Sequence, residues 1–284
     1  MNYADIFFQS DDGLALYARD YAGPAADAPV LVCLHGLTRN SKDFWRFAEH
    51  MQARARVIVP DTRGRGRSQR DAHAANYQLS RYVADTVGLF DHLKLGRVHL
   101  VGTSMGGLIS MLLLHAAPDR VASVVLNDIG PEIDAAGLSR IAGYAGKNMA
   151  VPDWASARKQ VKASNADAFP DYTDADWDAM ARDLFVQSNG QVVLDYDPAI
   201  AQGVADGSVA PDLWPLFQAL PKRPMLVVRG EVSDILSTAT VARMQAYWPG
   251  LRTIDVAQRG HTPTLVEPAV LAAVDDFYRP QFSV

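Results

Sequence analysis

The chain has 284 residues, of which 49% are hydrophobic and 21% are charged, and its net charge at pH 7 is −5. This composition is typical of a globular protein with a sizeable apolar core, and the mildly acidic charge argues against a nucleic-acid-binding protein. Because Cys33 is the only cysteine, the chain cannot form an intramolecular disulfide.

Two further absences bear on location. No apolar run approaches the roughly 18 residues that a membrane-spanning helix needs, and the first residues lack the basic and apolar regions of a signal peptide. We therefore expect a cytoplasmic protein with no membrane span. The sequence leaves the oligomeric state open between monomer and homodimer.

Strand and helix patterns alternate through the first half of the chain. Apolar runs bounded by turn residues predict a hairpin at residues 5–21 and buried strands at 29–36, 56–68, 97–104 and 121–131. Helical spacing is found at residues 41–55, 79–95 and 105–118. Ser41 is the expected N-cap of the first of these helices.

The alternation stops at residues 131–215, which contain several helical patterns and few clear strands. It resumes with strands at 223–231 and 251–257 and helices at 238–248 and 268–278. Such alternation predicts an α/β fold with a mostly parallel sheet and helices on both faces. We therefore expect one core, made of residues 1–130 and 216–284, that carries a helical insertion at 131–215.

The stretch Gly102-Thr103-Ser104-Met105-Gly106 lies between a predicted strand and a predicted helix. In that context the pattern G-x-S-x-G is typical of a nucleophilic serine on a tight turn, where only small residues fit on either side. The helix N-terminus would favour an oxyanion beside Ser104. The alternative is a glycine-rich turn whose serine only caps the helix.

A nucleophilic serine needs a base. Of the seven histidines, His261 lies in a loop directly after a late strand, where α/β sheets bind their ligands. It is the expected base. The other histidines lie on predicted helices, in an early loop or inside a strand, and His35 is expected to brace its own loop through a hydrogen bond.

The base in turn needs an orienting acid. Asp234 is the expected acid because one helix and one strand separate its loop from that of His261. Asp128, which follows the strand ending Val-Val-Leu-Asn, is an alternative, and Glu231 is a weaker one. Asp255 falls inside a predicted strand and is not favoured.

An oxyanion hole requires two backbone N–H donors near the nucleophile. Met105, the residue after the serine, supplies one of them. Leu37, in the loop after the strand at 29–36, is expected to supply the other, and Gly36 lets the backbone approach closely.

Taken together, these segments resemble the α/β-hydrolase fold superfamily over nearly the whole chain. The resemblance is carried by "HGLT", "DTRGRGRS", "GTSMGG", "RGEVSD" and "RGHTPTLVEP", in that order. It implies an eight-stranded sheet and a helical cap formed by the insertion, as in the cap-bearing esterases, lactonases and C–C bond hydrolases. Ser104 sets the chain apart from the branches of the superfamily that place aspartate at this turn.

The expected function is hydrolysis of small-molecule carboxylic esters through an acyl-enzyme on Ser104, with no metal and no organic cofactor. A lactonase or meta-cleavage-type C–C hydrolase with the same triad is an alternative, and a ligand receptor that keeps the fold is another. The insertion aromatics Trp154, Trp177 and Phe185 are expected to line the substrate pocket. Arg63 could bind a substrate carboxylate, but is expected to hold its own loop.

Overall fold

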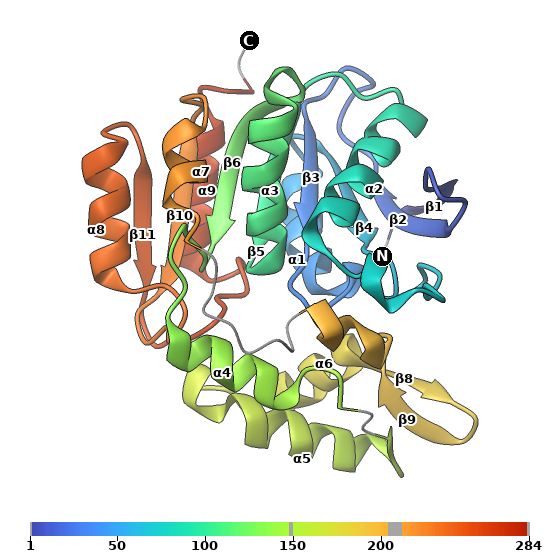
Figure 1. Cartoon of the computed structure of the whole chain (residues 1–284). Helices are drawn as coiled ribbons and strands as arrows, with labels where there is room; N and C mark the ends of the chain where they lie inside the picture. The colour runs from blue at the N-terminus through green and yellow to red at the C-terminus, as the bar shows by residue number, and fades with distance from the viewer. Residues whose placement is uncertain (1, 148–149, 204–211, 283–284) are drawn as a thin grey trace.

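The computed structural model describes residues 2–147, 150–203 and 212–282. Its main feature is an eight-stranded sheet in the order β1-β2-β4-β3-β5-β6-β10-β11 (Figure 1). The strands are β1 (Ala4–Gln9), β2 (Ala15–Tyr21), β3 (Val30–Leu34), β4 (Arg56–Asp61), β5 (Val98–Thr103), β6 (Val121–Asn127), β10 (Met225–Gly230) and β11 (Arg252–Val256). The β1–β2 and β2–β4 pairs are antiparallel and the other pairs are parallel. The predicted mostly parallel sheet is confirmed.

Alternate residues of the central strands pack on opposite faces of this sheet. In β3, Val32 and Leu34 join one apolar cluster, whereas Leu31 and Cys33 join the other. Side chains from α2 (Leu79–His92), α3 (Met105–Ala116), α7 (Trp214–Ala219) and α8 (Thr238–Tyr247) complete the first cluster. Those of α1 (Trp45–Met51) and α9 (Pro268–Tyr278) complete the second. Because helices cover both faces of the sheet, the central strands consist of nearly uninterrupted apolar residues.

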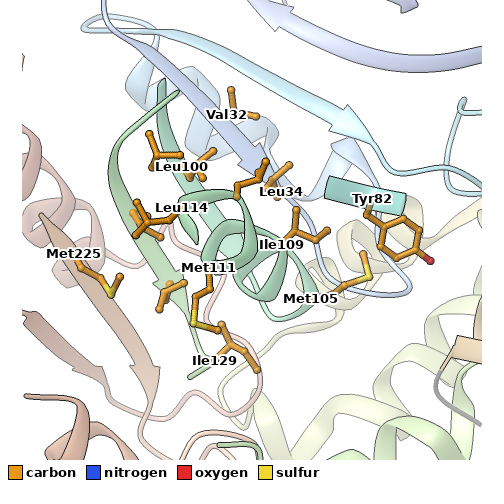
Figure 2. Packing of buried hydrophobic residues seen from close by; sticks show 14 of the residues in the cluster. Val32, Leu34, Tyr82, Leu100, Met105, Ile109, Met111, Leu114, Ile129 and Met225 are labelled. Atoms are coloured by element: carbon orange, nitrogen blue, oxygen red, sulfur yellow. The ribbon is translucent and has the colours of Figure 1, made fainter. Parts of the chain in front are cut away.

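The first cluster holds α3, the helix that follows Ser104, in place. Figure 2 shows Met105, Ile109, Met111 and Leu114 among the side chains packed beside β3, β5 and β6. These four residues of α3 are at most 5% exposed. The start of α3 is therefore fixed by packing as well as by its hydrogen bonds.

The insertion lies at the carboxyl ends of the parallel strands (Figure 1). It contains α4 (Ala135–Tyr144), α5 (Trp154–Asn165) and α6 (Asp174–Leu184), and a small antiparallel sheet in the order β7-β9-β8. The strands of that sheet are β7 (Ala150–Val151), β8 (Phe185–Ser188) and β9 (Gln191–Leu194). At two to four residues each, they are too short to be recognised from alternation in the sequence.

Two local predictions need correction. Ser41 is not the N-cap of its helical segment: the Asn40 side chain accepts a hydrogen bond from the Lys42 amide, while the Ser41 amide donates to Asp61. The insertion boundary predicted at residue 215 falls inside α7, whose Trp214 and Phe217 pack in the core. None of the described helices is long and apolar enough to cross a membrane.

Candidate active site

Ser104 occupies the tight turn between β5 and α3. Its backbone has φ 52° and ψ −116°, a conformation that a non-glycine residue rarely adopts. A Cβ on Gly102 would lie 2.3 Å from the Gly106 carbonyl oxygen, and one on Gly106 would lie 1.9 Å from that of Leu34. The two glycines are thus required by the close approach of helix and strands, as the sequence predicted.

The structure brings His261 to Ser104. His261 Nε2 lies 2.9 Å from Ser104 Oγ, which is within hydrogen-bonding distance. The His261 side chain is only 7% exposed. Its loop is held by Asn127, whose amide donates to the Pro263 carbonyl at 2.8 Å and to Thr103 Oγ1 at 3.1 Å. Asn127 therefore connects the loops that carry the histidine and the serine.

The carboxylate beside His261 belongs to Asp128. Asp128 Oδ2 lies 2.8 Å from His261 Nδ1, and the side chain is fully buried. Its other hydrogen bonds come from the Gly230 amide to Oδ1 at 2.8 Å and from the Ser233 hydroxyl to Oδ2 at 2.6 Å. Such an aspartate can hold one imidazole tautomer and stabilise the imidazolium.

The expected placement of Asp234 beside His261 is wrong. Asp234 instead forms a two-pronged ion pair with Arg140 of α4, at 2.6 and 2.8 Å, and its side chain is 37% exposed. The hydrogen bond to Arg140 is the largest cause of its lowered pKa. The reason is local: the loop after β10 turns Ser233 toward Asp128, so that the next side chain points to the insertion.

The other carboxylates considered from the sequence also lie elsewhere. Glu231 accepts a hydrogen bond from the Gln258 amide, and Asp255 pairs with Arg229 at 3.3 Å. Asp128 could have been favoured over Asp234 from the order of strands in the sheet. Strand β6 lies between β5 and β10, so the residue after β6 is beside both the nucleophile and the β10 loop. No motif in the sequence marks Ser233.

The loop after β3 is held in one orientation by His35. The Thr62 amide donates to His35 Nε2 at 3.0 Å, so the ring proton is on Nδ1, which donates to the Gly36 carbonyl at 2.7 Å. Burial lowers the pKa of His35 to about 3, which keeps the ring neutral. The N–H of a trans peptide points away from its carbonyl, so the Leu37 N–H is directed away from His35.

The two expected oxyanion donors lie close to the serine. A Cβ on Gly36 would be 3.8 Å from Ser104 Cβ, which brings the Gly36–Leu37 peptide beside Ser104. Met105 is the first residue of α3, where amides lack helical acceptors. Among the described residues, neither the Leu37 amide nor the Met105 amide donates to another group of the chain.

Two buried arginines support the glycine-rich loop after β4. Arg63 binds Asp85 at 2.6 and 2.7 Å, Asp71 at 2.6 Å and Asp12 at 3.0 Å, and its side chain is fully buried. It holds its own loop, as expected, and has no surface left for a substrate. Arg65 donates to the Leu37 carbonyl at 3.0 Å and thus braces the loop after β3 from the other side.

Two pockets lie where the insertion meets the core. One, here the acidic pocket, is lined by Thr103 and Thr262, next to the serine and histidine, and by Asp43, Asp176 and Asp183. The other, here the α5 pocket, is lined by Thr38 of the loop after β3, by Gln160, Val161 and Ser164 of α5, and by Phe185. Arg39 lines both pockets.

The aromatic residues expected to line the substrate pocket divide into two groups. Phe185 lines the α5 pocket. Trp177 is 1% exposed and packs in the apolar core of the insertion. Trp154 packs at the edge of that core, where Arg182 Cζ lies 4.1 Å from the centroid of its ring. Neither tryptophan lines the acidic or the α5 pocket, so these two pockets give no support to a substrate-contacting role for either. Helical spacing indicated burial but not which apolar core each tryptophan joins.

Comparisons with known proteins agree with this architecture. The 3-hydroxybutyrate-oligomer hydrolase of Cupriavidus necator is 35% identical over 281 residues, which are 95% of this chain and 94% of that protein. The 2-(acetamidomethylene)succinate hydrolase of Mesorhizobium japonicum is 29% identical over 254 residues, covering 88% and 87% of the two chains. The crystal structure of an α/β hydrolase from Novosphingobium aromaticivorans superposes with a TM-score of 0.92 at 40% identity, over 98% of both chains.

A sequence profile of the α/β-hydrolase fold matches residues 29–268. That span begins just before β3 and extends to the first residue of α9, so it includes the serine turn, the insertion and the histidine loop. The fold, the full-length relatives and the profile match lead to one conclusion: the chain is a hydrolase and belongs to the α/β-hydrolase fold family.

Proposed function

We infer that this hydrolase cleaves carboxylic esters of small molecules, with Ser104 as nucleophile, His261 as base and Asp128 as the orienting acid. The observation that carries the proposal is the continuous chain of hydrogen bonds, 2.9 Å from Ser104 Oγ to His261 Nε2 and 2.8 Å from His261 Nδ1 to Asp128 Oδ2. A serine activated in this way attacks acyl carbonyls.

The reaction takes two steps. Ser104 Oγ attacks the ester carbonyl while His261 takes the hydroxyl proton, and the Leu37 and Met105 N–H groups stabilise the tetrahedral oxyanion. His261 then gives that proton to the departing alcohol, which leaves an acyl-enzyme. His261 then takes a proton from water, which attacks the acyl carbonyl, and returns that proton to Ser104 Oγ as the acid is released.

The described elements of the insertion, α4 to α6 and β7 to β9, act in this proposal as a cap over the site. Support comes from their position at the carboxyl ends of the strands (Figure 1) and from the pockets that they form with the core. A cap excludes water and sets the shape of the substrate pocket.

The substrate class that we favour is short oligomeric esters of hydroxy acids. This rests on the Cupriavidus necator relative, a 3-hydroxybutyrate-oligomer hydrolase that matches 95% of this chain. Such esters have a compact acyl group and a free carboxylate at one end, which suits pockets of mixed polarity.

The test is hydrolysis of 3-hydroxybutyrate dimer and trimer beside p-nitrophenyl acetate, butyrate and octanoate, a small lactone and a meta-cleavage dienoate. We expect Ser104-dependent turnover of the esters, with Ser104→Ala lowering kcat by about 10⁶-fold at nearly unchanged thermal stability. Preferred turnover of the lactone or the dienoate would contradict ester hydrolysis as the main activity. A single slow turnover that leaves a stable adduct would indicate a receptor.

A further inference from the structure

Arg39 stands out among the cations near Ser104. It follows the expected oxyanion donor Leu37 by two residues, in a turn closed by a hydrogen bond from its amide to the Gly36 carbonyl. Its Cγ lies 3.6 Å, and Ser104 Cβ 3.8 Å, from the point where a Cβ on Gly36 would stand. The two side chains therefore start within one small volume, and the rest of the arginine extends from there.

The Arg39 guanidinium has spare donor capacity. Its side chain is 21% exposed, and among the described residues its one side-chain hydrogen bond runs to Asp43 Oδ1 at 3.4 Å. Arg63, by contrast, is saturated by three carboxylates. A guanidinium carries five N–H donors in a planar fork, so Arg39 can still bind a carboxylate through two parallel hydrogen bonds.

The two pockets that share Arg39 differ in charge. The acidic pocket also presents Asp43, Asp176 and Asp183 beside a second arginine, Arg46, so its carboxylates outnumber its arginines and disfavour a further anion. Among the described residues of the α5 pocket, Arg39 is the one charged side chain, and Gln160 and Ser164 are polar neighbours. A substrate carboxylate would therefore be drawn to the α5 side of Arg39.

Resting on the ester hydrolysis proposed above, we propose that Arg39 is a specificity-determining residue that binds the free carboxylate of the substrate's alcohol half, in the α5 pocket. When the alcohol half is a 3-hydroxy acid, its carboxylate carbon lies four bonds from the scissile carbonyl carbon, about 5 Å away at ordinary bond lengths. That span matches an arginine whose side chain starts beside the nucleophile. The substrate class is then an ester whose leaving group is a short hydroxy acid and not a neutral alcohol.

The experiment compares kcat/KM for 3-hydroxybutyrate dimer with that for its methyl ester, which differs only in the charge. Arg39→Met should lower the value for the acid by about 10- to 100-fold, the usual cost of losing a charged hydrogen-bonded partner, and leave that for the methyl ester within about 2-fold. Arg39→Lys should keep part of the preference for the acid over the methyl ester, because the lysine ammonium retains the positive charge but cannot form two parallel hydrogen bonds.

Arg46→Met is the matched control. Arg46 lines the acidic pocket and not the α5 pocket, so its loss removes the same charge nearby and should leave the acid-to-methyl-ester ratio unchanged. An equal fall for both substrates in Arg39→Met, or the same change of ratio in Arg46→Met, would overturn the proposal. Either outcome would show a loop-supporting or a long-range role for Arg39.

A binding measurement separates this proposal from the reaction itself. In the Ser104→Ala background, calorimetric titration with 3-hydroxybutyrate dimer reports affinity without turnover. Arg39→Met should weaken that affinity by about 10-fold or more, even if the physiological reaction proves not to be ester hydrolysis. Equal affinity with and without Arg39, or no binding of the dimer to the Ser104→Ala protein, would reject a carboxylate site at this position.

Discussion

The Ser233 hydroxyl, in the loop after β10, donates to Asp128 Oδ2, directly after β6, across 2.6 Å. The same carboxylate oxygen lies 2.8 Å from His261 Nδ1. The loops after two neighbouring strands thus meet at one carboxylate, and the residue after β6 supplies it. Because Asp128 contacts His261 and Asp234 does not, substitutions of these two candidate acids should have different effects.

Asp128→Asn should lower kcat by about 10⁴-fold with little change in KM, because an amide cannot hold the required tautomer or stabilise the imidazolium. Asp234→Asn should change kcat by less than about 3-fold, since its carboxylate pairs with Arg140, and a half-exposed ion pair contributes at most about 1 kcal/mol. Steady-state kinetics on both variants decide the matter. A severe loss in Asp234→Asn beside an active Asp128→Asn would reverse the assignment.

The Ser233 contact allows a stricter test, in which the acid is moved. In the Asp128→Asn background, Ser233→Asp places a carboxylate next to the position that Asp128 Oδ2 occupies, and should restore kcat by about 10-fold, given that an acid only has to orient and stabilise the imidazolium. In the wild-type background the same change puts two carboxylates side by side, which is unfavourable, and should lower activity. Ser233→Ala with Asp128→Asn is the control, because no restored activity is expected without the new carboxylate.

His35 provides a prediction about the oxyanion loop. Replacing His35 with alanine removes the hydrogen bond to the Gly36 carbonyl and the acceptor for the Thr62 amide. Complete loss of one oxyanion donor costs about 10²- to 10³-fold in kcat, so a misoriented Leu37 peptide should cost about 10- to 100-fold. The fall should appear in kcat more than in KM. An unchanged kcat in a folded His35→Ala protein would show that the loop keeps its orientation without the imidazole.

The burial of His35 also predicts a dependence of stability on pH. Its pKa falls from 6.5 to about 3 in the folded protein, so below pH 6.5 the unfolded chain binds a proton that the folded chain does not. The free energy of unfolding should therefore decrease as the pH is lowered from about 6.5 toward 3, by up to about 1.4 kcal/mol per pH unit from this residue. Denaturant unfolding of wild type and His35→Gln across that range gives the difference, because glutamine does not titrate. Parallel curves would contradict a buried neutral His35.

The candidate catalytic residues show how much of the site could be predicted from the sequence. Ser104 and His261 are marked by a motif and by a loop after a strand, and the structure brings them together. The acid depends on which strands are neighbours: β6 lies between β5 and β10, although many residues separate β6 from β10 in the chain. Reasoning from the order of motifs therefore favoured Asp234, whereas reasoning from the order of strands favours Asp128.

The insertion shows the same limit. Its helices α4, α5 and α6 follow from spacing and from caps such as Thr173, which forms a capping box with Asp176. Strands of two to four residues leave no periodic trace, and periodicity does not say whether a buried tryptophan faces a pocket or a core. That information resides in long-range packing.

The last prediction follows from that packing. Phe185 lines the α5 pocket, whereas Trp177, 1% exposed, lies in the insertion core and lines neither pocket. Phe185→Leu should therefore change the ratio of kcat/KM between acetate esters of short and long alcohols by about 10-fold, since the α5 pocket is the side proposed for the alcohol half and one apolar contact contributes about 1–3 kcal/mol of discrimination. Trp177→Phe should keep the parent ratio and lower only the free energy of unfolding, by up to about 3 kcal/mol because a cavity forms in the insertion core. A series of acetate esters from methyl to octyl, with thermal unfolding of each variant, measures both effects. If Trp177→Phe shifted the chain-length profile while Phe185→Leu did not, specificity would depend on the packing of the insertion core and not on the wall of the α5 pocket.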